Sequence, residues 1–182
     1  ADAPLSDGGW SFPVGSAASA EGWRVTLPLG ASWTAASGQQ YNGHLAEDWS
    51  RLDGKSLGQP VYAAADGEVV VAKQNCGNYV DVVVLKHQVA GLGEIYSMYG
   101  HIETTVKVGD RLQRRQQMGV LGNPVTFGPH LHFEVKDRAA LVNKPFSSCA
   151  VPAQGVYVSA GYSGKRNDYA GGDFWDPSND GV

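Results

Sequence analysis

Histidine is the residue type whose spacing in this sequence best suits metal binding or proton transfer. The chain contains five histidines, which are His44, His87, His101, His130 and His132. His130 and His132 flank Leu131 in a run typical of a β-strand, where alternate side chains share one face and Glu134 is next along it. Two imidazoles on one face could bind a metal ion or transfer protons, but a polar strand face without metal has the same pattern. Glu134 could support a ligand imidazole or lie on the surface.

A second candidate pair lies earlier in the chain. His44 and Asp48 are four residues apart, so a helical or tight turn would point both the same way and offer one nitrogen and one carboxylate oxygen. Glu47 competes with Asp48 for the oxygen role on spacing alone. Together the two pairs supply two histidines and a carboxylate, the ligand types of a catalytic zinc site, in which a fourth position is kept for water. A non-haem iron site uses the same ligand types.

The segments that must position these residues are strand-like. Strands are expected over residues 23–27, 68–73, 78–87, 94–102 and 130–136, with turn signals such as Asp66-Gly67 between them. Helical periodicity is weak everywhere, so the sequence predicts an all-β fold, mainly of antiparallel sheet. We expect a single domain over residues 1–182, with its core at 43–137. Residues 1–42 would be an irregular part packed on that core by aromatic side chains, and 138–182 a C-terminal extension.

Composition excludes several classes of protein. The 182 residues carry a net charge of −4 and are 42% hydrophobic, which permits a core and argues against a general nucleic-acid binder. No apolar run approaches the roughly 20 residues that span a bilayer. No signal peptide is recognisable, which is compatible with a processed, secreted protein. Cys76 and Cys149 would form one disulfide in such a protein, or remain two buried thiols.

The order of the motifs resembles that of a known family. The motifs are His44-x-x-x-Asp48, Tyr99-Gly100-His101 and Gly128-Pro129-His130-Leu131-His132-Phe133. They resemble those of the lysostaphin-type (LytM-like) zinc metalloendopeptidases, which are peptidoglycan hydrolases. The segments 60–69, 106–110 and 118–122 are also similar to this family, so the resemblance covers about residues 43–137. It implies the peptidase fold of that family, with an open substrate groove.

The resemblance also implies roles for individual residues. His44, Asp48 and His132 would bind one zinc ion, and His101 and His130 would be the catalytic pair that does not bind the metal. Tyr99 would orient the site or contact the substrate, and His87 would be structural. The implied activity is hydrolysis of peptide bonds in peptidoglycan stem peptides or cross-bridges. We expect a bacteriolytic monomer, secreted or periplasmic, that acts on cell-wall peptides and binds no nucleic acid.

Two other functions fit parts of the sequence. The first is an inactive relative that binds the cell wall or activates another hydrolase, but such proteins usually lack metal ligands. The second is a biotinyl- or lipoyl-type carrier domain, which the segments 61–70 and 106–119 resemble. No lysine lies in the expected hairpin between them, so the sequence favours the peptidase.

Overall fold

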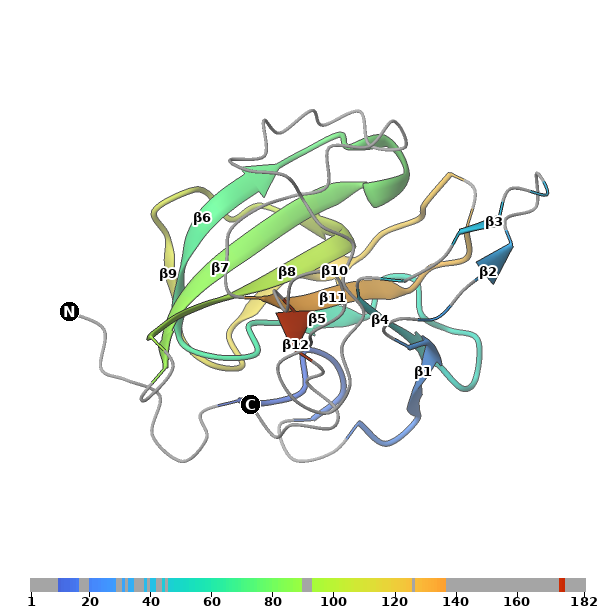
Figure 1. The fold of residues 1–182 in the computed structure, drawn as a ribbon, viewed down its shortest axis with the longest axis horizontal. Coiled ribbons are helices and arrows are strands. Elements are labelled where there is room, and N and C mark those ends of the chain that lie inside the picture. The colour runs from blue at the N-terminus through green and yellow to red at the C-terminus, as the bar shows by residue number, and fades with distance from the viewer. Residues whose placement is uncertain are drawn as a thin grey trace.

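The computed structural model describes the strands expected from the sequence and the turns between them. It describes residues 10–16, 20–28, 31, 33–34, 38, 40–41, 44, 46–89, 93–125, 127–136 and 174–175. Among these residues the regular structure is β-sheet and one short 3-10 turn, η1 (Gly77–Tyr79), without an α-helix (Figure 1). No helix in these ranges is long and apolar enough to cross a membrane. The predicted all-β fold is therefore confirmed.

One twisted antiparallel sheet carries the candidate site. Its main path runs, in spatial order, through β1 (Trp23–Leu27), β4 (Glu47–Arg51), β11 (Leu131–Lys136), β8 (Gly93–Thr104), β7 (Asp81–Val89), β6 (Gly67–Lys73) and β9 (Arg111–Leu112). Beside this path, β10 (Gln117–Leu121) pairs with β8 and with β5 (Pro60–Tyr62), and β12 (Phe174–Trp175) pairs with β11. A separate small sheet joins β2 (Trp33–Thr34) to β3 (Gln40–Tyr41). Figure 1 shows β6, β7 and β8 side by side as the longest part of the main sheet.

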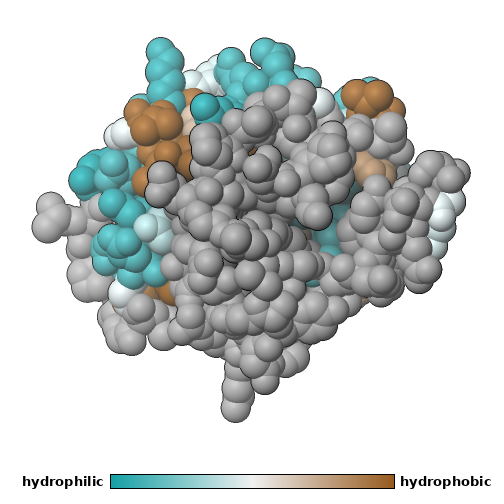
Figure 2. Space-filling model, turned by 45° about the horizontal axis from the view of Figure 1, so that its top comes forward, coloured by the Kyte–Doolittle hydropathy of each residue, from teal (hydrophilic) through white to brown (hydrophobic). Residues whose placement is uncertain are grey.

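The central strands are buried on both faces, which explains their run of valines. Val83 and Leu85 of β7 join the main hydrophobic core on one face of the sheet, together with Tyr99 and Phe133. Side chains of the opposite face form a second, smaller cluster, which consists of Cys76, Tyr79, Val82, Val84 and Met98. A strand covered on both sides needs no polar alternation, which explains the four consecutive apolar residues at positions 82–85 of β7. The described surface is mostly hydrophilic on the face drawn in Figure 2, with apolar side chains in a few separate places.

The segment 10–16 is fastened to the core by an arginine. The Arg115 guanidinium donates hydrogen bonds to the carbonyl oxygens of Phe12 and Gly15, each at 2.6 Å, and lies 3.8 Å from the centre of the Tyr62 ring. Phe12 also packs edge-on against Trp49. These aromatic contacts are of the kind expected for the N-terminal part. Residues 137–173 lie outside the described ranges, so the division into a core and a C-terminal extension stays a prediction.

Cys76 is fully buried and disulfide-bonded. It directly precedes η1, and its backbone N–H donates to the Val80 carbonyl oxygen at 2.6 Å. Cys149, the second cysteine of the chain, lies outside the described residues, so the pairing of these two cysteines stays a prediction. The bond at Cys76 agrees with the disulfide interpretation rather than with two buried thiols.

His87 is a structural residue of the core, as expected. Its Nδ1 donates to the Asp66 carbonyl oxygen at 2.7 Å, and its Nε2 lies 2.6 Å from the Ser97 hydroxyl, so both ring nitrogens are occupied. A Cβ added at Gly67 would lie 2.7 Å from the same Nδ1, which explains why glycine stands there. Burial lowers the pKa of His87 to about 4, an effect that the Asp66 carbonyl opposes only in part.

This buried histidine predicts acid-sensitive stability. In the unfolded chain His87 titrates near its ordinary pKa of about 6.5, so as the pH falls below that value the unfolded state takes up a proton that the folded state excludes. The free energy of unfolding should therefore lose about 3 kcal/mol between pH 6.5 and 4 through this residue. Urea unfolding across this pH range would measure the loss. His87→Gln, which does not titrate, should show a shallower dependence on pH, and equal slopes would contradict the prediction.

Candidate metal centre

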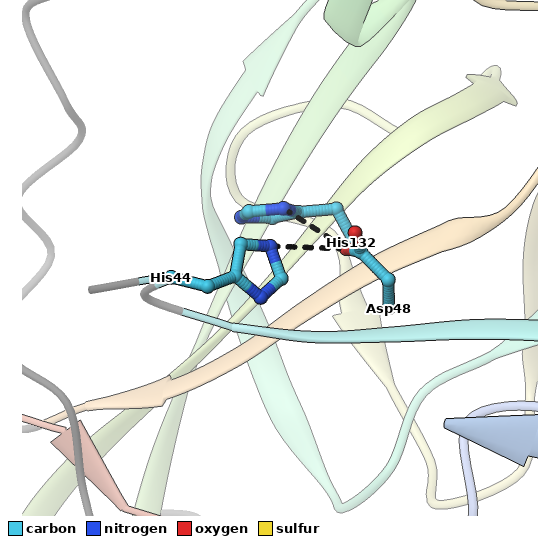
Figure 3. Close-up of side chains that lie close together, drawn as sticks. All are labelled: His44, Asp48 and His132. Atoms are coloured by element: carbon cyan, nitrogen blue, oxygen red, sulfur yellow. Dashed lines mark ion pairs between the residues drawn. The ribbon is translucent and has the colours of Figure 1, made fainter. Parts of the chain in front are cut away.

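Three predicted ligands meet where strands β4 and β11 pair. His132 of β11 lies opposite Asp48 of β4 in the antiparallel register, and His44 lies just before β4. One ligand atom from each of the three residues lies within 4.8 Å of those of the other two. His44 Nε2 is 3.3 Å and His132 Nδ1 is 3.4 Å from Asp48 Oδ1 (Figure 3). Figure 3 shows the two imidazoles converging on the carboxylate.

The local structure around Asp48 differs from the expected turn. Asp48 lies within strand β4, not in the helical or tight turn that the spacing of His44 and Asp48 suggested for it. Strand alternation also resolves the competition between the two neighbouring carboxylates. Glu47 is buried away from the histidines and accepts a hydrogen bond from Trp49 Nε1 at 3.2 Å, whereas Asp48 faces them. The oxygen donor of the cluster is therefore Asp48.

The cluster has the charge and the open acceptor that a cation requires. Burial opposes ionisation of Asp48, but His132 and His44 outweigh it and hold the pKa of this carboxyl well below its usual range. Asp48 Oδ1 is buried, and no described group makes a hydrogen bond of good geometry to it. A buried, ionised oxygen without such a bond is costly unless a cation neutralises it. Two imidazoles and one carboxylate are ligand types that zinc prefers, so the residues present fit a zinc ion.

Glu134 supports one of the predicted ligands. Its side chain is fully buried, and His132 Nε2 donates to its Oε1 at 2.8 Å, which leaves Nδ1 of the same ring facing Asp48. Burial lowers the pKa of His132, but Asp48 and Glu134 more than compensate and raise it to about 9. A carboxylate behind a ligand imidazole fixes the orientation of the ring and increases its basicity. Of the two options for Glu134, the structure supports the one inside the site.

Removing this supporting charge should weaken metal binding. Glu134→Gln keeps the size of the side chain but removes its negative charge, so we expect the affinity for zinc to fall roughly 10- to 100-fold. Competition with a chromogenic chelator would measure the affinity. Glu94→Gln, on the exposed part of the neighbouring strand β8, is the matched control and should bind zinc like the unaltered protein. Equal affinities for the two variants would contradict this role of Glu134.

The two predicted catalytic histidines border the cluster. The ring centroids of His101 and His130 are 4.4 Å apart, and His101 lies 5.9 Å from His132. His130 Nδ1 donates to the Gly128 carbonyl oxygen at 2.7 Å, which directs Nε2 toward Asp48 Oδ2, at 3.5 Å. The structure therefore brings the three predicted ligands and both predicted catalytic histidines to one place.

His101 reaches the site because strand β8 is irregular there. Gly100 pairs with Val82 and Ile102 with Asp81, so His101 is an extra residue in a β-bulge. Its backbone φ of 61° lies in the left-handed region, which is uncommon for a residue other than glycine. The bulge turns His101 to the same face as Gly100, where regular alternation would have turned it into the main core.

Tyr99 lies in the core, so its predicted contribution to the site could only be made through strand β8. Tyr99 is fully buried in the main core against Phe133, with ring centroids 5.2 Å apart. Its hydroxyl accepts the Ala64 N–H at 2.9 Å and is hydrogen-bonded to the Ser97 hydroxyl. Tyr99 therefore anchors strand β8 from the side opposite to the site.

Two aromatic residues at the site were not predicted from the sequence. Tyr79 packs on His101 from the second cluster, and Phe127 lies edge-on to both His101 and His130 with centroid distances of 6.3 Å. Phe127 is 41% exposed. The sequence signal for Phe127 is its position just before Gly128-Pro129. For Tyr79 the signal is indirect, because a side chain on Gly100 would collide with its ring.

Comparison with known proteins places the chain in a family. The model of peptidase family M23 matches residues 51–144. Lipoprotein NlpD of Yersinia enterocolitica is 32% identical over 89 residues, which are 48% of this chain and 88% of that sequence. Peptidoglycan DD-endopeptidase ShyA of Vibrio cholerae is 40% identical over 93 residues, and murein hydrolase activator NlpD of Escherichia coli is 30% identical over 89. These two matches also cover 48% of this chain, but only 20% and 22% of the relatives' own lengths.

A solved structure has the same fold. The crystal structure of a zinc containing peptidase from Vibrio cholerae superposes with a TM-score of 0.54 at 23% identity, covering 70% of this chain and 36% of the other. At this identity the likeness establishes the fold alone. The family model spans just over half of the 182 residues; it includes His101, His130 and His132, and begins after His44 and Asp48. The protein therefore belongs to peptidase family M23.

Proposed function

We propose that this protein is a zinc-dependent endopeptidase that hydrolyses peptide bonds in bacterial peptidoglycan, in stem peptides or cross-bridges. The observation that carries the proposal is the buried triad of His44, Asp48 and His132 with two further histidines beside it. Three ligands leave a coordination position open, which is typical of catalytic rather than structural zinc sites. When bound, one zinc ion would polarise a substrate carbonyl and make water acidic enough to attack it near neutral pH.

The chain's own residues would position the reactants and move protons. Asp48, held ionised, contributes the negative charge that retains the cation, and Glu134 fixes the ring of His132. Because the Gly128 carbonyl accepts the Nδ1 proton of His130, a neutral His130 has its lone pair on Nε2, facing the triad. His130 is thus suited to accept a proton from the attacking water and to return it to the leaving amine. His101, next to it, would stabilise the developing negative charge.

A second candidate function is that of an activator of another hydrolase. The observation that favours it is the similarity of this chain to proteins named murein hydrolase activator NlpD. The conjunction of a complete ligand triad and two adjacent histidines favours catalysis instead, because a pure binder has no need of them. We further propose that the protein is a monomer with a single peptidase domain. It would be secreted or periplasmic, where a bacteriolytic enzyme reaches the peptides of the cell wall.

Analysis of digested cell walls would separate the two functions. Purified walls with glycine cross-bridges and walls of the diaminopimelate type would each be incubated with the protein, and the released fragments identified by mass spectrometry. We expect new peptide termini that disappear with a chelator and return when zinc is added. If folded, zinc-loaded protein released no new peptide termini from either wall, the proposed endopeptidase activity would be contradicted. Stimulation of an added peptidoglycan hydrolase under those conditions would then support the activator function.

A further inference from the structure

We propose that Tyr79 is a positioning residue that holds the imidazole of His101 in its working orientation by stacking on it. This inference rests on the proposed function, because it assigns His101 a part in the reaction. The ring of Tyr79 lies nearly parallel to that of His101, with an interplanar angle of 11° and centroids 5.1 Å apart. It also meets the ligand His132 edge-on, at 5.3 Å and 86°. One buried ring therefore packs against a catalytic histidine and a predicted ligand at once.

His101 needs such support because its backbone is strained. It is the extra residue of the bulge in β8 and has a φ of 61°. Residues held in sparsely populated backbone regions persist only where their surroundings determine them strongly. The Gly122 N–H fixes the backbone of His101 by donating to its carbonyl oxygen at 2.8 Å. The imidazole itself is held between the rings of Tyr79 and His130.

The backbone around Tyr79 is also held in a defined conformation. Tyr79 ends the turn η1, which the Cys76 N–H closes by donating to Val80 O, while the Val80 N–H donates to Gly77 O at 2.9 Å. Val80 has a φ of 59°, an unusual conformation for a β-branched residue, and bridges to Ile102 directly after His101. The strained residues Val80 and His101 thus belong to adjoining segments, where they bring the two rings together.

The neighbouring strand is shaped to admit the ring. A Cβ added at Gly100 would lie 2.8 Å from Tyr79 Cδ1, closer than side-chain carbons approach one another. Tyr79 itself is only 7% exposed and belongs to the second cluster. A residue that merely filled this cluster would not need to lie parallel to an imidazole. A flat ring stacked against the imidazole restricts the rotation of the His101 side chain.

Kinetics of three variants on cell-wall peptides would test the inference. Tyr79→Leu removes the flat ring and should lower kcat roughly 10- to 100-fold, because small displacements of a catalytic group cost that much, with KM nearly unchanged. Tyr79→Phe keeps the ring and should retain most of the kcat. Val84→Ala opens a cavity in the same cluster without a ring contact to a site histidine, and should lower stability but not kcat. The zinc content of each variant would be measured in the same preparations.

A spectroscopic readout separates this inference from the proposed function. Ring currents from Tyr79 should shift the imidazole C–H signals of His101 in NMR spectra. Tyr79→Phe should keep this shift and Tyr79→Leu should remove it. If the protein cleaves no wall, the proposed function fails, and these spectra still test the positioning. Equal kcat in all variants, or loss of kcat in Tyr79→Phe as large as in Tyr79→Leu, would overturn it. Unchanged His101 signals in Tyr79→Leu would do the same.

Discussion

Replacing Asp48 with asparagine is expected to remove the metal from the protein and to lower peptidoglycan cleavage about a thousandfold, equivalent to about 4 kcal/mol of transition-state stabilisation. The substitution keeps the shape of the side chain but replaces the anionic oxygen that lies between His44 Nε2 and His132 Nδ1. A neutral amide oxygen is a poor ligand for zinc, and the two imidazoles alone leave the site one ligand short. Zinc content by atomic emission and release of wall peptides would measure both effects.

The matched control is a substitution of the preceding residue, Glu47. Glu47 is also a buried carboxylate of strand β4, but it faces Trp49 instead of the histidines. Glu47→Gln should therefore keep about one equivalent of zinc and most of the cleavage. If Asp48→Asn bound zinc as tightly as Glu47→Gln, the triad would not be the metal site.

Replacing His130 with alanine should separate catalysis from metal binding. We expect zinc to remain bound and kcat to fall about a thousandfold, within the range that general acid–base catalysis contributes. His130 is suited to this role because its Nδ1 is tied to the Gly128 carbonyl and its Nε2 faces Asp48. His101→Ala should likewise retain zinc and lose activity, since His101 lies beside His130 rather than in the triad.

Chemical rescue would strengthen the assignment of His130. Its side chain is 13% exposed, so free imidazole added to His130→Ala could enter the space left behind and restore part of the kcat. Loss of zinc from His130→Ala would instead make His130 a ligand. Full activity in this variant would contradict any part in the reaction, and an activator function would survive the substitution unchanged.

The sequence predicted the ligand types and most of the sheet, because both depend on local patterns. The alternation around Leu131 placed His130 and His132 on one face, and β1 has the bounds expected for it. The strand expected over residues 78–87 begins instead at Asp81, because η1 occupies the preceding residues. The spacing of His44 and Asp48 suggested a turn, but Asp48 lies in β4, and the local spacing could not reveal that this strand pairs with the distant β11.

The remaining errors come from one irregularity. Tyr99 and His101 are two residues apart and would share a face in a regular strand, which favours a common role at the site. The bulge at His101 breaks this rule, so that His101 enters the site while Tyr99 stays in the core. A bulge depends on what the neighbouring strand can pair with, here Asp81 and Val82, and leaves no mark in the strand's own sequence. The same holds for Tyr79, whose ring contacts residues far along the chain.

The place of β11 between β4 and β8 determines when during folding the site can exist. Asp48 and His132 are roughly eighty residues apart in the chain, and joining them closes a long loop before any contact compensates for the lost entropy. Sheets built on such distant pairings fold on the order of milliseconds to seconds, rather than microseconds. A nascent chain that ends before His130 contains His44 and Asp48 but neither His130 nor His132. The candidate metal site can therefore form only after β11 has been synthesised and has paired with β4 and β8.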